Sequence, residues 1–218
     1  MEFMLDTANL NEIQAGLSTY PLDGVTTNPS ILKAALPMDY FDHLKKIKFL
    51  CGARTLHVQL GSPDFDSMMA EAERIWEHLG KDVYLKVPVT ETGLKGIQAL
   101  KKQGAHITAT CIYYPIQGIM AIHAGADYLA PYCNRMAANE IDFARAIAQM
   151  RQLIDRDGYD SKILAASFKT PSQITQAIDA GAHCVTVPPA LMKQALSSSL
   201  VMDAVAAFEK DQNMVFEG

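Results

Sequence analysis

The sequence lacks the features of secreted, membrane-spanning or nucleic-acid-binding proteins. Its four cysteines are far apart and form no CxxC pair, which favours free thiols in a reducing compartment over a disulfide framework. No apolar run approaches the ~20 residues that span a bilayer, and the N-terminal stretch MEFMLDTANL has no basic residue, unlike a secretory signal. A net charge of -5 provides no basic face for nucleic acid. We therefore expect a cytoplasmic protein without membrane or nucleic-acid partners.

What the chain does contain is a regular alternation of two patterns. Eight short runs have strand character, and segments with helical spacing, such as 66–80 and 140–158, separate them. The runs are FMLDT (3–7), GVTTN (24–28), TLHVQL (55–60), VYLKVPV (83–89), HITATCIY (106–113), YLAPYC (128–133), KILAAS (162–167) and CVTVPP (184–189). This alternation is typical of parallel βαβ units. Eight units predict an α/β fold, a single (β/α)8 TIM barrel over residues 1–218; a doubly wound open sheet is the alternative.

The tail after the eighth run predicts one additional helix. The segment SSLVMDAVAAFEKDQ is amphipathic, and we place a C-terminal helix at 199–213. Its residues Val201, Val205 and Phe208 recur at helical spacing and form an apolar stripe. This stripe could close the end of its own barrel, or it could dock on a neighbouring subunit.

A lysine interrupts the fourth strand run, VYLKVPV, which otherwise has the composition of a protein core. Side chains on a strand alternate between faces, so Lys86 lies opposite the aliphatic side and points into the barrel. Four other runs also place a polar residue inward near the carboxyl end, where barrel enzymes have their active sites. The five converging residues are Asp6, Asn28, Gln59, Lys86 and Thr110. The same parity puts Cys111 on the aliphatic face of its strand. The alternative is a half-exposed sheet with its polar face in water.

A lysine in this position can act as a nucleophile. Burial disfavours the charged form and lowers the pKa of the amine, and a neutral amine can attack a carbonyl to form a Schiff base. The protonated imine withdraws electrons from a neighbouring carbon–carbon bond, so aldol cleavage or formation needs no metal. Asp6 is placed to exchange protons, and Asn28 to orient the lysine or bind a substrate hydroxyl. A purely structural Lys–Asp pair is the alternative.

Five co-linear motifs resemble the transaldolase family of class I aldolases. They are LDT (5–7), GVTTNPS (24–30), YLKVPVT (84–90), APYCNR (130–135) and ILAASFKTP (163–171). Their order and spacing are similar to the small-subunit branch of that family, which includes fructose-6-phosphate aldolase. The resemblance covers essentially the whole chain. It implies that Lys86 is the Schiff-base lysine, with Asp6 and Asn28 as its polar companions, and that no metal or other cofactor takes part.

Two positions bear on the activity that the resemblance implies. Gln59 stands where classical transaldolases have a glutamate, and Tyr132 where they have a phenylalanine. Glutamine can hold a water but cannot take its proton, so the Tyr132 hydroxyl becomes the expected proton-transferring group, with Gln59 and Thr110 positioning the water. This combination favours reversible cleavage of fructose 6-phosphate to dihydroxyacetone and glyceraldehyde 3-phosphate. The alternative is a transaldolase that passes the dihydroxyacetone unit to a second sugar phosphate in the pentose phosphate pathway.

The resemblance also implies how a sugar phosphate is bound. Arg135 and Ser167 are expected at the phosphate, since phosphate sites of such barrels follow the late strands and a guanidinium suits phosphate. Lys169 stands where transaldolases have arginine and is expected to assist. Thr27 is assigned to substrate binding with Asn28. For Arg135, a surface salt bridge is the alternative.

Two further functions and the assembly remain open at this point. A metal-dependent aldolase would use His57 and His106, which share the interior parity, but the chain has no HxH or HExxH spacing. A non-catalytic sugar-phosphate-binding barrel would give no reason for a lysine at position 86. The resemblance implies a homo-oligomer of pentamer rings stacked into decamers, with the C-terminal helix reaching an adjacent subunit.

Overall fold

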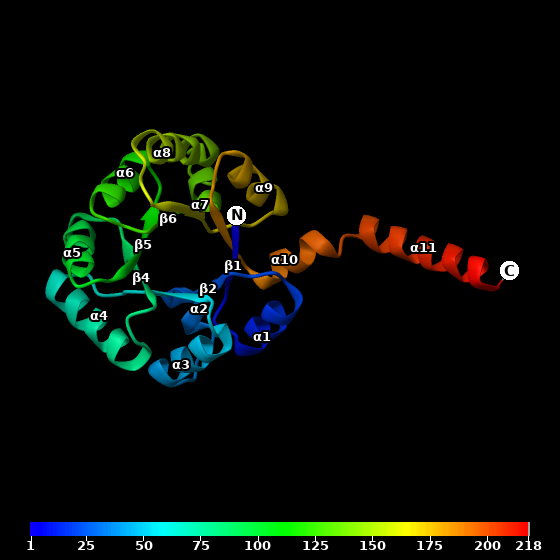
Figure 1. Cartoon of the computed structure of the whole chain (residues 1–218), viewed down its shortest axis with the longest axis horizontal. Coiled ribbons are helices and arrows are strands. Elements are labelled where there is room, and N and C mark those ends of the chain that lie inside the picture. Colours follow the sequence, from blue (N-terminus) through cyan, green and yellow to red (C-terminus); the bar gives the residue numbers. More distant parts are fainter. Residues whose placement is uncertain (218) are drawn as a thin grey trace.

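In a computed structural model, which describes residues 1–217, the chain forms a closed barrel of eight parallel strands (Figure 1). The strands are β1 (Glu2–Asp6), β2 (Gly24–Thr26), β3 (Thr55–Gln59), β4 (Tyr84–Pro88), β5 (His106–Ile112), β6 (Tyr128–Pro131), β7 (Lys162–Ala165) and β8 (Cys184–Val187). The strands follow one another in chain order, and β1 pairs with β8 to close the sheet. The predicted TIM barrel is confirmed, and the open sheet is excluded. The predicted domain extends to residue 218, which lies outside the described residues.

The helices of residues 1–217 alternate with the strands and surround the barrel. They are α1 (Leu10–Thr19), α2 (Pro29–Lys33), α3 (Tyr40–Cys51), α4 (Phe65–Leu79), α5 (Glu91–Lys102), α6 (Pro115–His123), α7 (Cys133–Ala137), α8 (Phe143–Asp157), α9 (Pro171–Asp179), α10 (Pro189–Leu196) and α11 (Ser199–Glu217). Side-chain caps set several of their starts: Asp64 and Asp142 accept from the backbone N–H of Ser67 and Arg145.

The outward faces of the strands carry the aliphatic core. On β4, Leu85 and Val87 are fully buried against the helices. The turn from β4 to α5 is tight, because a Cβ at Gly93 would lie 1.9 Å from the Pro88 carbonyl oxygen. Glycine at this position lets α5 begin directly above the carboxyl end of β4.

The barrel interior is filled in layers. A lower apolar layer contains Met4, Tyr128, Leu164 and Cys184, with Tyr84 packed against it. Above it lies a polar layer, in which four inward-facing residues from β2, β3, β5 and β8 are fully or almost fully buried. Its members are Thr26, His57, Thr108 and Thr186. The lower part of the interior is thus a packed apolar core, and the upper part is polar. Polar side chains that could react with a ligand therefore lie toward the carboxyl ends of the strands.

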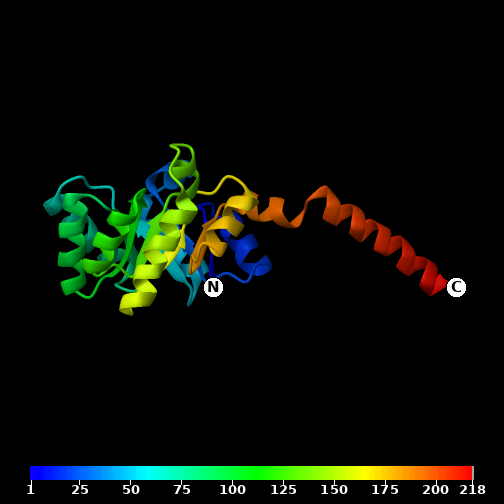
Figure 2. The ribbon, with the colours of Figure 1, turned by 90° about the horizontal axis from the view of Figure 1, so that it is seen from above.

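The last helix does not pack on the barrel from which it emerges. In Figures 1 and 2, α11 extends away from the barrel beyond α10. Its side chains from Ser199 to Phe216 are all exposed, including Phe208 at 71%. A C-terminal helix is therefore present and longer than the predicted 199–213, and the alternative in which it closes its own barrel is not what the structure shows.

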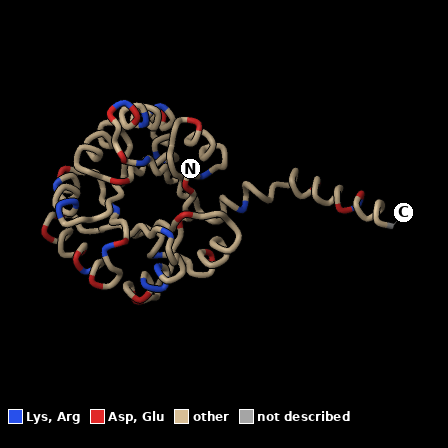
Figure 3. The backbone as a smooth tube through the Cα atoms, viewed as in Figure 1, with Lys and Arg blue, Asp and Glu red and all other residues tan. Residues whose placement is uncertain are grey.

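Neither the distribution of charge nor the hydropathy identifies a binding partner. Basic and acidic residues are interspersed around the outer helices (Figure 3). Within residues 1–217, no helix has both the length and the apolar composition needed to cross a bilayer.

All four cysteines are free in the structure. The sequence placed three of them in strands, but Cys133 begins α7 because β6 ends at Pro131.

Candidate active site

A cavity of about 670 Å³ opens at the carboxyl ends of the strands. It brings together eight of the ten residues that the sequence analysis assigned to chemistry or substrate binding. These eight are Asp6, Asn28, Gln59, Lys86, Tyr132, Arg135, Ser167 and Lys169. The other two, Thr27 and Thr110, are fully buried behind its wall. The predicted convergence of polar side chains is thus visible in the fold.

Lys86 lies in the middle of β4, between Gln59 on β3 and Thr108 on β5. Its side chain points inward and is only 6% exposed, at the wall of the cavity. Nζ donates a hydrogen bond to the carbonyl oxygen of Thr27 at 2.7 Å. Burial lowers the pKa of the amine, and the nearby Asp6 carboxylate opposes this shift without reversing it. The fold therefore makes the neutral, nucleophilic form of this amine more accessible than that of an exposed lysine.

Asp6 ends β1 and is held through a chain of two threonines. The Thr26 hydroxyl donates to Asp6 Oδ1 at 2.7 Å, and it lies 2.6 Å from the hydroxyl of Thr186. Since Thr26 has a single proton, Thr186 must donate to Thr26. Burial raises the pKa of the Asp6 carboxyl, while Lys86 and Thr26 partly offset the rise. Asp6 and Lys86 thus line the same cavity, and burial disfavours the charged form of each.

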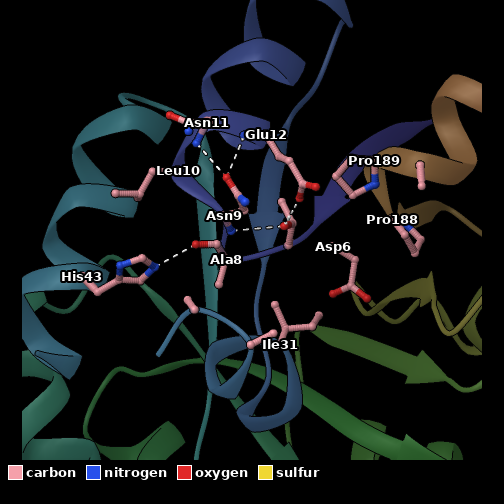
Figure 4. A pocket seen from close by; sticks show the side chains of 14 residues that line it. Asp6, Ala8, Asn9, Leu10, Asn11, Glu12, Ile31, His43, Pro188 and Pro189 are labelled. Carbon is pink, nitrogen blue, oxygen red and sulfur yellow. Dashed lines mark hydrogen bonds between the residues drawn. The ribbon is translucent and has the colours of Figure 1, made fainter. Parts of the chain in front are cut away.

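Asp6 also borders a second cavity of about 620 Å³, between α1, α2 and α10 (Figure 4). Polar groups around this cavity are already engaged within the chain. His43 Nε2 lies 2.7 Å from the Ala8 carbonyl, and the Thr7 hydroxyl donates to Glu12 at 2.6 Å. Asn9 caps the start of α1. The cavity gives Asp6 a second open side but offers few free polar groups to a ligand.

His57 lies below Lys86 in the polar layer and has a structural environment. Nδ1 is 2.8 Å from the Thr108 hydroxyl, and the ring stacks on Tyr84 with 4.6 Å between centroids. Burial, together with the charge of Lys86, lowers its pKa well below the ordinary value. Within residues 1–217, no three His, Cys, Asp or Glu side chains gather where they could hold a metal ion.

Tyr132 follows β6 and projects its hydroxyl into the cavity wall. Thr110 Oγ1 donates to the phenol oxygen at 2.9 Å, and Cys111 Sγ donates to it at 3.6 Å. The guanidinium carbon of Arg135 lies 5.0 Å from the centre of the Tyr132 ring. Burial is the main cause of a raised phenol pKa. The phenol is therefore protonated at neutral pH and can act as a proton donor.

Gln59, at the end of β3, has an incompletely satisfied side chain. Its Oε1 is buried and has no hydrogen-bond partner among the described residues. Buried polar atoms are almost always paired, with protein or with water. A group bound in the cavity beside Lys86 can complete this pairing.

Three polar or cationic residues that follow β6 and β7 also line the cavity. Arg135 comes from α7, Ser167 follows β7, and Lys169 precedes the capped start of α9. The two loops are tied together, since Asn134 N donates to Ser167 O at 2.9 Å and Gln173 Nε2 donates to Asn134 Oδ1 at 3.1 Å. Guanidinium, hydroxyl and ammonium groups around one cavity suit a phosphate.

Thr27 and Asn28 differ from the expected arrangement. Strand β2 ends at Thr26, so Asn28 caps α2 by accepting from Ile31 N at 3.0 Å. Thr27 contacts Lys86 through its carbonyl, while its hydroxyl donates to the His57 carbonyl at 3.2 Å. The backbone, rather than the side chain, is what Thr27 presents to the lysine. Strand parity predicts neither the helix cap formed by Asn28 nor the contact of the Thr27 carbonyl with Lys86.

Cys111 lines the cavity although the sequence analysis did not assign it there. Parity predicted it on the aliphatic face, but it lines the cavity with Lys86. Strand β5 has an irregular register between Ala109 and Ile112, and Cys111 has φ of 60°. A bulge of this kind turns a side chain to the other face of the sheet. Only the lower part of β5 follows the regular alternation.

Comparisons with known proteins agree with this geometry. Residues 3–217 match the family described as transaldolase/fructose-6-phosphate aldolase. A protein of Streptococcus pneumoniae described as a probable fructose-6-phosphate aldolase is 47% identical over 212 residues, which cover 97% of this chain and 96% of the relative.

Proposed function

The chain belongs to the transaldolase/fructose-6-phosphate aldolase family, and from this premise we propose that it cleaves fructose 6-phosphate reversibly to dihydroxyacetone and glyceraldehyde 3-phosphate. The observation that carries the proposal is Lys86, a buried lysine with a lowered pKa at the wall of the cavity. The name of the Streptococcus pneumoniae relative supports the choice of substrate.

The reaction begins with attack of the neutral Lys86 amine on C2 of the ketose. The carbinolamine loses water to give a protonated imine, which draws electrons from the C3–C4 bond. A base removes the C4 hydroxyl proton, the bond breaks, and glyceraldehyde 3-phosphate leaves. The enamine that remains takes a proton at C3. Water then hydrolyses the imine, which releases dihydroxyacetone and regenerates the amine.

Asp6 and Tyr132 are the proton-transfer groups in this proposal. Asp6 shares the space of Lys86, and its raised pKa suits it to exchange protons in the carbinolamine and imine steps. Tyr132, protonated at neutral pH, gives its proton to C3 of the enamine and regains one from the water that hydrolyses the imine, with Thr110 donating to its hydroxyl. The buried and unpaired Oε1 of Gln59 supports its assignment to holding the water.

Substrate binding is assigned to the remaining predicted residues. We place the phosphate at Arg135, Ser167 and Lys169, which all line the cavity. Asn28, also at the cavity, is assigned to a sugar hydroxyl. Thr27 supports the site through the carbonyl that accepts from Lys86.

Incubation with fructose 6-phosphate alone, and then with erythrose 4-phosphate added, tests the proposal. Release of glyceraldehyde 3-phosphate without an acceptor is the expected result. Product only after the acceptor is added would instead assign transaldolase activity. Binding of sugar phosphate without turnover in either case would assign a non-catalytic binding barrel.

We also propose a homo-oligomer and a cytoplasmic location. The exposed apolar side chains of α11 include Leu200, Val205, Phe208 and Val215. A monomer rarely exposes so large an apolar surface, which supports docking of α11 on a second copy of the chain. The pentamer and decamer arrangement rests on the family resemblance. The location rests on the phosphorylated sugar, a cytoplasmic metabolite, as substrate.

A further inference from the structure

The phenol oxygen of Tyr132 receives two hydrogen bonds from neighbouring residues of β5. Thr110 Oγ1 donates to it at 2.9 Å, and Cys111 Sγ donates at 3.6 Å. A hydroxyl oxygen accepts through two lone pairs and donates one proton. With both lone pairs engaged, the proton of the phenol has to point away from Thr110 and Cys111. The open direction is the cavity, whose wall Tyr132, Cys111 and Lys86 share.

The position of the thiol depends on an unusual backbone. Cys111 has φ of 60°, in the left-handed region that non-glycine residues rarely adopt. Gln117 holds this conformation from α6. Its Nε2 donates to the Cys111 carbonyl at 3.4 Å, and its Oε1 accepts from Tyr113 N at 2.9 Å. Strained residues persist where the surrounding contacts determine their conformation, often at functional sites.

The other cysteines differ from Cys111 in their surroundings. Cys51, Cys133 and Cys184 are fully buried, whereas Cys111 is partly exposed at the cavity. A structural thiol on β5 would follow the alternation and face the helices. The bulge instead places this thiol beside the phenol, and Cys111 adopts a strained backbone conformation there.

We infer that Cys111 is a positioning residue for Tyr132: together with Thr110 it engages the acceptor sites of the phenol and directs the phenol proton toward the reacting atoms. This inference rests on the proton-transfer role proposed for Tyr132. Without the thiol, the phenol proton can turn away from the cavity, and a smaller fraction of molecules holds it ready for transfer. Binding of the sugar phosphate is not affected.

Steady-state kinetics with fructose 6-phosphate provide the first test. We expect Cys111→Ala to lower kcat about three- to tenfold, the range of one weak to ordinary hydrogen bond, with KM unchanged. Cys111→Ser keeps a donor and is expected to restore most of kcat. Cys51→Ala, which removes a thiol far from the cavity, serves as the matched control. Wild-type kcat in Cys111→Ala, or a Cys111→Ser enzyme as slow as Cys111→Ala, would overturn the inference.

Thiol labelling provides a second test that does not depend on activity. Methyl methanethiosulfonate reacts with thiolates, and peptide mass analysis identifies the modified cysteine. Loss of the phenol acceptor frees the thiol, so Tyr132→Phe is expected to speed labelling of Cys111 about three- to tenfold. Tyr113→Phe removes a neighbouring phenol hydroxyl and is expected to leave the rate unchanged.

The two tests separate the inference from the proposed function. Equal labelling rates of Cys111 in wild type and Tyr132→Phe would overturn the contact between thiol and phenol. A wild-type protein that fails to cleave fructose 6-phosphate would overturn the proposed function, and with it the catalytic part of the inference. Cleavage by the wild type with unchanged kcat in Cys111→Ala would overturn the inference alone.

Discussion

Replacing Lys86 by methionine should make the protein more stable at neutral pH while abolishing turnover. Methionine has a similar length and no charge, so it fills the same space in the barrel. The lowered pKa of Lys86 means that burial of the ammonium group outweighs its attraction to Asp6. Removing the charge relieves that net penalty. The variant loses one contact, from Nζ to the Thr27 carbonyl, which water from the cavity can replace.

The sign of the pH dependence follows from proton linkage. The pKa of Lys86 is lower in the fold than its ordinary value of 10.5, so between the two values the unfolded chain binds more protons. The unfolding free energy of the wild type therefore rises with pH across that window, and the burial penalty is complete below the lowered pKa. Lys86→Met lacks this rise. The stability difference between the two proteins should be largest at low and neutral pH and shrink toward pH 10.5.

Thermal unfolding can measure a stability difference of this size between wild type and Lys86→Met. Each unit of lowered pKa corresponds to about 1.4 kcal/mol, and 1 kcal/mol moves the Tm of a domain of this size by about 2–4 °C. Differential scanning fluorimetry of wild type and Lys86→Met from pH 6 to 10 measures the difference directly. Lys46→Met, at an exposed site, controls for the loss of a charge. A variant less stable than wild type throughout, or a difference constant with pH, would refute the reasoning.

Three other predictions concern the site and the assembly. Tyr132→Phe should lower cleavage of fructose 6-phosphate about 10²–10⁴-fold, as loss of a general acid does, while transfer to erythrose 4-phosphate persists; equal loss of both in product assays would contradict the role of the hydroxyl. Arg135→Leu should raise KM for glyceraldehyde 3-phosphate at least about tenfold, as loss of a charge-assisted hydrogen bond does, and leave KM for glyceraldehyde unchanged, with Lys169→Met showing a smaller effect. Phe208→Glu on α11 should reduce the mass measured by light scattering; an unchanged mass would exclude this face from the interface.

The sequence predicted most of the barrel because eight short strand-like runs alternate regularly with helical segments, and side chains within most runs alternate with period two. The inward direction of Lys86 and Gln59 followed from that parity alone, and both line the cavity. The alternation of side chains gave wrong positions where a strand is irregularly paired or ends early. The bulge in β5 turned Cys111 inward, and the early end of β2 placed Asn28 at a helix cap. A bulge is set by contacts from other elements, here Gln117, which a local pattern does not contain.

Backbone contacts and long-range packing could not be predicted from the sequence either. The partner of the Lys86 amine is a carbonyl oxygen, that of Thr27, and every residue has one, so no residue type could have identified it. The apolar stripe of α11 was readable from its spacing, but whether it packs on its own barrel depends on the path of the chain after α10 (Figure 2). The amphipathic pattern specifies a buried face and not its partner.

Borohydride trapping tests the central claim most directly. The protein is incubated with dihydroxyacetone or fructose 6-phosphate, reduced, digested and mapped by mass spectrometry, with Lys86→Met as the control. A reduced adduct on the peptide that contains Lys86, and on no other peptide, is the predicted result. An adduct on a different lysine, or turnover of fructose 6-phosphate by Lys86→Met at the wild-type rate, would contradict the account.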